Sequence, residues 1–249
     1  MKKLFLITFL ISFVFSAYGQ RNPNSEYWNT FHYKAKEGNE QKFIQAAAIK
    51  TKKFNANPEN LIVTYRITTG ENAGVYERIM PFQSSKRYDR DASKELKYWA
   101  ENVAPYASPV GGQQIWVRLK WADVNIDPND PPFKHLLKTT YIVKPTHQNH
   151  FGTFMARIGK IMAKRMPDAG RLVLRLFSGG QRNMFVSYIA FDTFEHNNPK
   201  FDSTWEDDYN EIFGWDSWNT DTKLFDESLE MIVGEQRVSL ELVEELLPN

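Results

Sequence analysis

The sequence contains no cysteine among its 249 residues. This absence excludes disulfides, thiolate metal sites, cysteine nucleophiles and iron–sulfur clusters. The fold must therefore be stabilised by packing, and the aromatic content of 14% favours a well-filled core.

Several motifs of known chemistry are also missing. No Gly-x-Ser-x-Gly occurs, so an α/β-hydrolase is unsupported. The segment Ser178-Gly179-Gly180-Gln181 is a hairpin rather than a phosphate loop, because no Lys-Ser or Lys-Thr and no helix follow it. His147 and His150 have a spacing that can bind metal, but no carboxylate follows at a ligand spacing. We therefore predict no metal site.

The one long apolar run lies at the N-terminus. Leu4 to Phe15 follows Lys2 and Lys3, and Ala17-Tyr18-Gly19 places small residues before Gln20. This pattern predicts a signal peptide over residues 1–19 and export of a bacterial protein, either periplasmic or secreted, with no membrane attachment after cleavage. The alternative is an uncleaved membrane anchor. A lipoprotein anchor is excluded because no cysteine follows the run.

Charge is nearly balanced overall, at +1, but unevenly placed. Residues 202–249 carry fourteen acidic and two basic side chains, whereas 134–182 carry ten basic side chains against Asp168 alone. A basic surface could steer an anionic ligand; alternatively, the acidic C-terminal part packs beside the basic part of the same domain. We expect no nucleic-acid partner for an exported protein.

An internal repeat indicates how the chain is built. Arg66 and Arg175 lie in apolar, strand-like runs, each four residues before a turn glycine, and are separated by 109 residues. The same offset relates further identical pairs: Thr30 and Thr139, Ala47 and Ala156, Pro58 and Pro167, and Phe82 and Phe191. The repeat predicts two related halves.

Hydrophobic periodicity gives each half the order β-α-β-β-α-β. In the first half we expect strands over 27–36, 61–67, 75–82 and 115–121 and helices over 40–54 and 84–102. We place the first unit at residues 20–124, a proline-rich linker at 125–133 and the second unit at 134–249. An acidic, Trp-rich insertion near 199–220 interrupts the second unit.

The β-α-β-β-α-β order is that of the ferredoxin-like motif. Together with the helix length and the repeat, it resembles the dimeric α/β-barrel superfamily in fused, tandem form. The resemblance implies an α+β fold in which two ferredoxin-like units pack sheet to sheet as a pseudo-dimeric α/β barrel. Members of the superfamily include monooxygenases that often use no cofactor, heme-degrading enzymes and chlorite dismutase-like heme proteins.

Strand alternation suggests a ligand site. If Val63, Tyr65 and Ile67 face the helices, Arg66 faces the space between the sheets, and Arg175 does so in the second half. His32 and its counterpart Tyr141 then line the same cleft, with Trp116 nearby. Arginine and histidine side chains there could bind a carboxylate or phosphate. Alternatively, the arginines lie at a strand edge and pair with Glu77 or with the acidic C-terminal strand, or the orientation assumed for these strands is reversed.

Three functions remain open at this point. The first is an exported, non-catalytic protein that binds a small anionic molecule or a partner, with no cofactor. The second, by fold resemblance, is a monooxygenase-like or heme-binding oxidoreductase. The third is a protein that contacts a partner through Trp205, Trp215 and Trp218, because exposed aromatic clusters are typical contact anchors.

Overall fold

The computed structural model describes residues 25–231 and 235–248, so the predicted signal peptide lies outside the described residues. Its strands are β1 (Tyr27–Ala35), β2 (Val63–Ile67), β3 (Val75–Gln83), β4 (Ala107–Pro109), β5 (Gln114–Arg118), β6 (His135–Ile142), β7 (Gly170–Ser178), β8 (Met184–Phe191) and β9 (Glu235–Leu242). Its helices are α2 (Glu40–Phe54), α3 (Ser93–Asn102), α4 (Gln148–Arg165), α5 (Phe194–Asn197), α6 (Trp205–Phe213) and α7 (Ser217–Ser228). None of these helices is both long and apolar enough to span a membrane.

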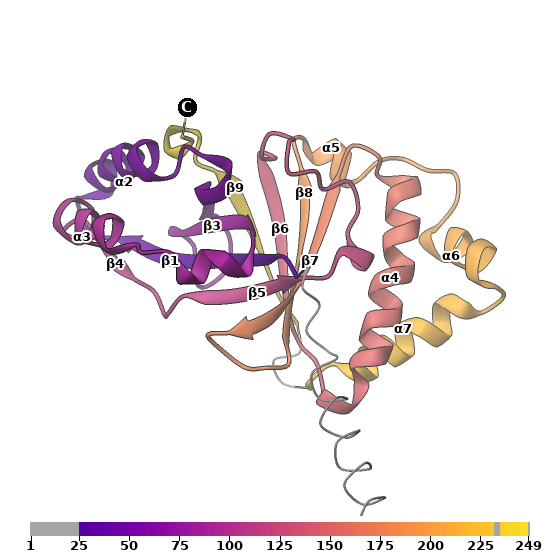
Figure 1. The fold of residues 1–249 in the computed structure, drawn as a ribbon. Coiled ribbons are helices and arrows are strands. Elements are labelled where there is room, and N and C mark those ends of the chain that lie inside the picture. The colour runs from indigo at the N-terminus through magenta and orange to yellow at the C-terminus, as the bar shows by residue number, and fades with distance from the viewer. Residues whose placement is uncertain (1–24, 232–234, 249) are drawn as a thin grey trace, which may run out of the picture.

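The strands form one closed antiparallel barrel of eight strands, with β4 added beside β1 (Figure 1). The order around the barrel is β3-β2-β9-β6-β8-β7-β5-β1, and β1 pairs with β3 to close it. The two halves of the chain join edge to edge, because β2 pairs with β9 and β5 pairs with β7.

The predicted fold class, two ferredoxin-like units packed sheet to sheet, is wrong. Hydrogen-bonded ladders connect the halves at both seams, where Tyr65 pairs with Leu242 and Val117 with Arg175. Two separate sheets would leave four edges with unpaired backbone groups, and closure into a barrel satisfies them. The core is therefore the interior of one barrel rather than a layer between two sheets.

Alternate residues of each strand fill this interior. The central hydrophobic cluster takes its side chains from both halves: Trp28, Val63, Tyr65, Ile67, Val75, Ile79, Trp116, Leu136, Leu172, Leu174, Leu176, Val186, Tyr188, Ala190 and Leu240. The strand positions between them point outward toward helices or solvent. Outward positions such as Ile62 and Thr64 are buried as well, so alternation alone does not say which face is inside.

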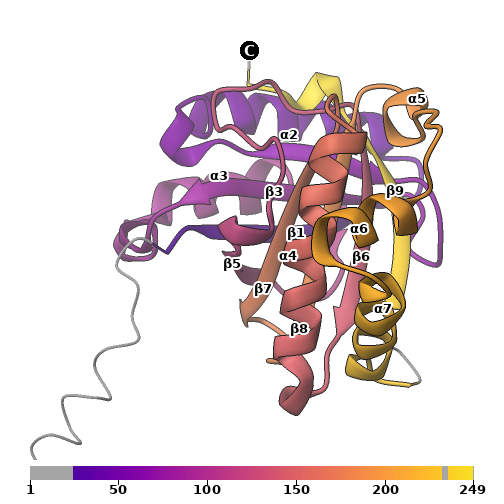
Figure 2. The same ribbon diagram turned by 90° about the vertical axis from the view of Figure 1, so that its right-hand side faces the viewer.

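The helices cover the outside of the barrel on two sides. Helices α2 and α3 lie over the strands of the first half, and α4, α6 and α7 lie over those of the second (Figures 1 and 2). Phe43 and Ala47 of α2 pack against Tyr76 of β3, whereas Phe151 of α4 and Phe225 of α7 pack around Tyr141. The predicted helix over 40–54 coincides with α2.

Candidate functional site

A cluster of polar side chains crosses the middle of the barrel. Glu77 of β3 is fully buried and accepts hydrogen bonds from Lys138 Nζ at 2.8 Å and from the Tyr188 hydroxyl at 2.6 Å. His32 Nε2 lies 3.2 Å from the same carboxylate. The four residues come from β1, β3, β6 and β8, so the cluster joins both halves of the chain.

The cluster fixes the ionisation of two of its members. Burial on its own would raise the pKa of Glu77, but Lys138 and the hydrogen bond from His32 hold that pKa well below its usual range. Burial, followed by the neighbouring Glu77 charge, raises the pKa of Tyr188 well above its usual value. Glu77 is therefore an anion and Tyr188 a neutral donor at neutral pH.

His32 and Lys138 also line a cavity at one mouth of the barrel. This cavity has a volume of about 330 Å³, and its polar lining includes Gln114, Thr140 and Gln236. His32 shares the interior with Thr30, as strand alternation predicts, and whether it contacts a ligand stays a prediction.

Two of the other predicted site residues lie on opposite sides of the barrel wall. Trp116 is buried inside, where its Nε1 donates to Thr30 Oγ1 at 3.0 Å. Tyr141 points outward, with its ring 5.3 Å from that of Phe151. It therefore does not occupy the counterpart position of His32. The interior residue at that place is Thr140, one position earlier, which lines the same mouth as His32.

Arg66 and Arg175 lie on the outside of the barrel, which reverses the orientation assumed for their strands. Val63, Tyr65 and Ile67 face the interior, and Arg66, half-exposed, lies 3.4 Å from Glu40 of α2. Arg175 is exposed as well. The alternative pairing with Glu77 is also wrong, since that carboxylate is inside the barrel. The structure thus separates the two arginines from His32 and Trp116.

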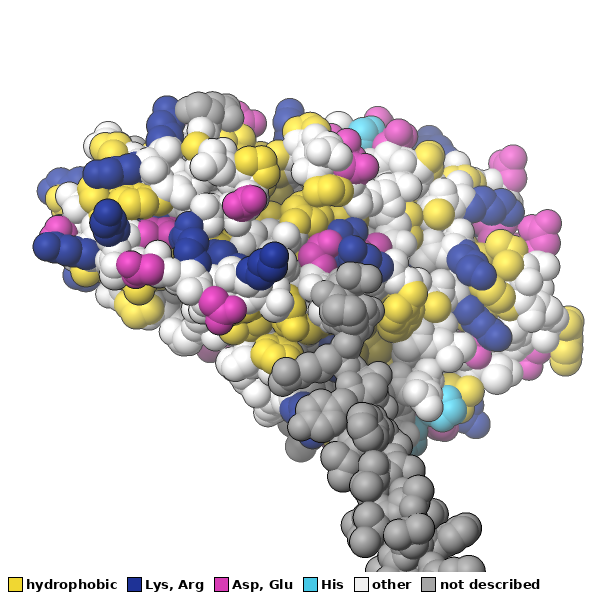
Figure 3. All heavy atoms as spheres, viewed as in Figure 1, with side chains coloured by type: hydrophobic (Ala, Val, Ile, Leu, Met, Phe, Trp, Pro, Cys, Tyr) yellow, Lys and Arg dark blue, Asp and Glu magenta, His cyan; other side chains and the backbone are white. Residues whose placement is uncertain are grey.

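A second polar cavity lies outside the barrel, between helix α3 and the outer face of β1 and β3. Its volume is about 280 Å³, and its walls combine cations with aromatic rings. Lys50, Arg78, Arg87 and Arg90 line it together with Tyr33, Tyr88 and Trp99, and Glu95 is the one carboxylate among the lining residues. Lys and Arg side chains are also numerous on the surface around α2 and α3 (Figure 3).

Arg78 is the central cation of this cavity. It is 2% exposed, and its guanidinium donates to Thr51 Oγ1 at 2.6 Å and to Thr64 Oγ1 at 3.3 Å. Its carbon Cζ lies 5.0 Å from the centre of the Trp99 ring. Among the described residues no carboxylate forms a salt bridge with Arg78. Its hydrogen-bond partners are neutral, and Glu95, which pairs with Lys50 and Arg90, offsets the cost of burying its charge only in part. An anion in the cavity would offset the rest of that cost.

Lys50 lies beside Arg78 in the same wall. Its Nζ donates to Glu95 Oε1 at 2.6 Å and to Asn55 Oδ1 at 2.7 Å. Burial, and then the neighbouring Arg78 charge, lower the pKa of Lys50 to about 8. A neutral Lys50 keeps two N–H groups for these two acceptors and gains a lone pair, so it can accept a proton near neutral pH.

In the second half, aromatic side chains of the described residues fill the space between the helices and the barrel. The rings of Phe151 and Phe225 stack with their centres 5.7 Å apart, and Phe154 packs 4.6 Å from Phe225. Tyr141 and Phe185 complete this filled interface. The two halves have therefore diverged, and the open helix–sheet cavity belongs to the first half.

The cavity beneath α3 does not fit a heme. Heme iron takes a histidine, a cysteine, a tyrosinate or a methionine paired with histidine, and no histidine is among its lining residues. Burial raises the pKa of Tyr33 and, to about 12, that of Tyr88, which disfavours a tyrosinate ligand. Among the described residues, no three His, Asp or Glu side chains are placed so that they could hold a metal ion together. The ring centres of His147 and His150 lie 5.8 Å apart.

The three tryptophans of the predicted contact surface differ in exposure, since Trp205 and Trp218 are partly buried. Trp215 is 94% exposed, but Trp205 packs under the Arg165 guanidinium and Trp218 packs against Tyr209. The contribution of these residues to a partner contact stays a prediction, and Trp215 is the residue of the three that is open to solvent.

No family model matches the chain, and no curated protein matches it either. Solved structures do share its fold. A candidate monooxygenase from Lactobacillus acidophilus has a TM-score of 0.59 at 10% identity, covering 88% of this chain and 94% of that one. A candidate monooxygenase from Fusobacterium nucleatum has a TM-score of 0.52 at 14% identity, covering 88% of this chain and 93% of that one. A variant of chlorite dismutase from Candidatus Nitrospira defluvii has a TM-score of 0.53 at 7% identity, covering 88% of this chain and 92% of that one.

These neighbours are monooxygenase-like and chlorite dismutase-like proteins of the dimeric α/β-barrel type, in agreement with the resemblance noted in the sequence. At such low identity the likeness concerns the fold alone. It does not specify a family, and it carries no residue assignment to this chain.

Proposed function

We propose that this protein is an oxygenase-type enzyme that binds a small, planar, anionic substrate in the cavity beneath helix α3. The observation that carries this proposal is Arg78, a buried arginine that lines the cavity and forms no salt bridge with a carboxylate among the described residues. The shared fold of the monooxygenase-like neighbours supports the reaction type.

The walls define the substrate class. Arg78 can hold a carboxylate in a bidentate manner, and Trp99, Tyr33 and Phe31 offer flat apolar surface beside it. A cavity of about 280 Å³ lies near the lower end of the usual range for small-molecule sites. A one- or two-ring aromatic carboxylate therefore suits the cavity in both size and charge.

Lys50 supplies the chemistry in this proposal. In its neutral form it takes a proton from an activated methylene of the bound substrate, and the protonated Lys50 then stabilises the resulting anion, while Arg78 holds the carboxylate. Such an electron-rich anion can reduce molecular oxygen. The balanced reaction is R₂CH₂ + O₂ → R₂C=O + H₂O, with one oxygen atom in the ketone and the other in water.

Oxindole-5-carboxylate is a suitable probe, because it is planar, anionic and has an activated methylene. We expect saturable binding and conversion to the coloured isatin-5-carboxylate, with one atom from ¹⁸O₂ in the product. Arg78→Met should weaken binding at least tenfold, whereas Lys50→Met should retain binding and lose turnover. Absence of binding would contradict the anion site, and binding without oxygen uptake would contradict the oxygenase reaction.

Export remains part of the proposal. The pattern of residues 1–19 supports cleavage before Gln20. Mass spectrometry of the protein purified from a bacterial periplasm or culture medium should find a chain that begins at Gln20. Recovery of the full-length chain from the cytoplasm would contradict this part.

A further inference from the structure

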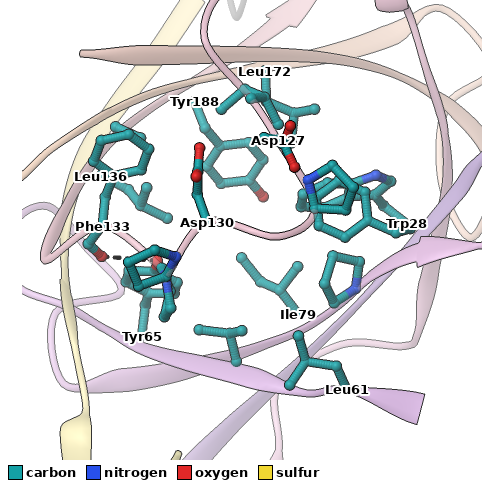
Figure 4. Close-up of a pocket in the computed structure, with 18 residues that line it drawn as sticks. Trp28, Leu61, Tyr65, Ile79, Asp127, Asp130, Phe133, Leu136, Leu172 and Tyr188 are labelled. Carbon is teal, nitrogen blue, oxygen red and sulfur yellow. Dashed lines mark hydrogen bonds between the residues drawn. The ribbon is translucent and has the colours of Figure 1, made fainter. Parts of the chain in front are cut away.

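A third cavity opens at the other end of the barrel, opposite the mouth that His32 lines. Its volume is about 110 Å³ and its walls are mainly apolar. In Figure 4 the side chains of Trp28, Ile79, Leu136 and Leu172 surround one common space. Trp28, Ile79, Leu136 and Leu172 all belong to the buried core cluster of the barrel.

The polar groups of this cavity indicate an uncharged ligand. No lysine or arginine is among its lining residues, and Asp127 and Asp130 stand at its rim, which disfavours an anion. The Tyr188 hydroxyl donates its proton to Glu77, so its oxygen remains an acceptor for a ligand hydroxyl. The Tyr65 hydroxyl, which donates to the Phe133 carbonyl oxygen, offers a second acceptor in the same way. The cavity thus combines apolar walls with hydroxyl oxygens that can accept a hydrogen bond.

The proline-rich segment 126–133 covers the cavity and is fixed at both ends. The Asn125 side chain donates to the carbonyl oxygens of Pro167 and Ala169 at 3.0 and 3.1 Å. The Tyr65 hydroxyl donates to the carbonyl oxygen of Phe133 at 3.0 Å, as Figure 4 shows. The segment therefore forms a strap across the barrel end.

Two of the three non-glycine residues with a positive φ among the described residues lie at the edges of the same cavity. Phe82 and Asn125 have φ values of +56° and +49°, in the left-handed region that side chains other than glycine rarely adopt. Phe82 lines the cavity, and Asn125 begins the strap. Strain of this kind persists only where the surroundings enforce it, and it is common at ligand sites.

We propose that the strap-covered end of the barrel is a second binding site, which takes a small uncharged ring compound with one hydroxyl group, such as a simple phenol. An engineered apolar cavity of about 150 Å³ binds benzene. This cavity, of about 110 Å³, is smaller and has to widen by an outward shift of the strap to hold one ring. This site is independent of Arg78, which lies outside the barrel.

Phenol is the probe, with binding measured by titration calorimetry and its position determined in a soaked crystal. We expect phenol beneath the strap and an affinity at least several-fold higher than that of toluene, which has no hydroxyl. Ala190→Leu places extra carbon atoms in the cavity and should weaken phenol binding at least tenfold. If that variant does not fold, Ile79→Phe fills the same space from β3.

Arg78→Met is the matched control, and it should leave phenol binding unchanged. That result separates this site from the anion site, since either can fail alone. The proposal is overturned if phenol does not bind, if it binds Ala190→Leu as tightly as the wild type, or if the crystal places it outside the barrel.

Discussion

Lys138 and Glu77, from opposite halves of the chain, form an ion pair of 2.8 Å inside the barrel. Their side chains are 10% and 0% exposed, so the Glu77 charge is fully buried and the Lys138 charge nearly so. The pair lies between the two barrel-end cavities, since Lys138 lines one and Tyr188, bonded to Glu77, lines the other. The ion pair thus links the two halves of the chain at the place where it separates the two cavities.

Glu77→Gln should destabilise the protein by about 3–5 kcal/mol, because it leaves the buried Lys138 ammonium without its counter-ion. Urea unfolding measures the loss. The double variant Glu77→Leu with Lys138→Met should recover most of it, since no buried charge then remains. Equal losses in the single and double variants would show that the ion pair does not explain the effect.

Acid should unfold the protein partly through Glu77. The folded-state pKa of this carboxyl is lower than the ordinary value of 4.5, so its contribution to stability is complete above that pH. The contribution is lost as the pH falls below about 4.5, when the unfolded chain binds the proton more readily. Plots of unfolding free energy against pH should therefore be flatter below pH 4.5 for Glu77→Gln than for the wild type.

Arg78→Met should leave the unfolding free energy within about 1 kcal/mol of the wild type, because removal of a desolvated charge offsets the hydrogen bonds lost to Thr51 and Thr64. Arg165 provides the matched comparison, since it is equally buried but pairs with Asp208. Arg165→Met should be clearly more destabilising in the same urea titration. A larger loss for Arg78→Met would mean that this arginine is structural.

Turnover of oxindole-5-carboxylate should rise with pH, with its midpoint near 8, because Lys50 acts in its neutral form. Probe affinity should stay level across the same range, because the pKa of Arg78, lowered by burial, is still about 10. Parallel measurement of kcat and of the dissociation constant from pH 6 to 9.5 checks both. If the affinity for the probe fell over the same pH range in which kcat rose, the charged form of Lys50 would bind the anion. Proton transfer by Lys50 would then not be supported.

Gly179→Ala should destabilise the barrel more than Gly38→Ala. Both glycines have positive φ, which costs alanine about 1–2 kcal/mol, but a Cβ at Gly179 would lie 2.3 Å from the Gln113 carbonyl oxygen. A Cβ at Gly38 meets nothing within 4 Å. Thermal unfolding of the two variants gives the difference, and equal melting temperatures would contradict the close packing of the β7–β8 hairpin on β5.

Periodicity in the sequence located most elements but not their inner and outer faces. The predicted helix over 40–54 and the strand beginning at Tyr27 agree with α2 and β1. In β2, however, Val63 and Tyr65 alternate with Ile62 and Thr64, and all four are buried, so the pattern does not show which side faces the barrel. The orientation assumed for Arg66 and Arg175 was reversed for this reason.

Sequence patterns did not predict the polar cluster around Glu77 or the cavity beneath α3. For the polar cluster, however, the sequence does carry a signal. Glu77 stands between Val75 and Ile79 on one strand face, where a charge implies a buried partner. That partner, Lys138, is 61 residues away, and only the closed barrel brings it near. Arg78 and Lys50 meet beneath α3 through the packing of a helix on a strand, which no local pattern encodes.

An iodide soak of wild-type crystals, followed by anomalous diffraction, is the most direct test of an anion-binding site at Arg78. Iodide occupies an anion site whatever the natural substrate is. We expect an iodide in contact with the Arg78 guanidinium beneath α3, and its loss in Arg78→Met crystals. Iodide bound only at surface lysines and arginines, with none at Arg78, would contradict an anion-binding site in this cavity.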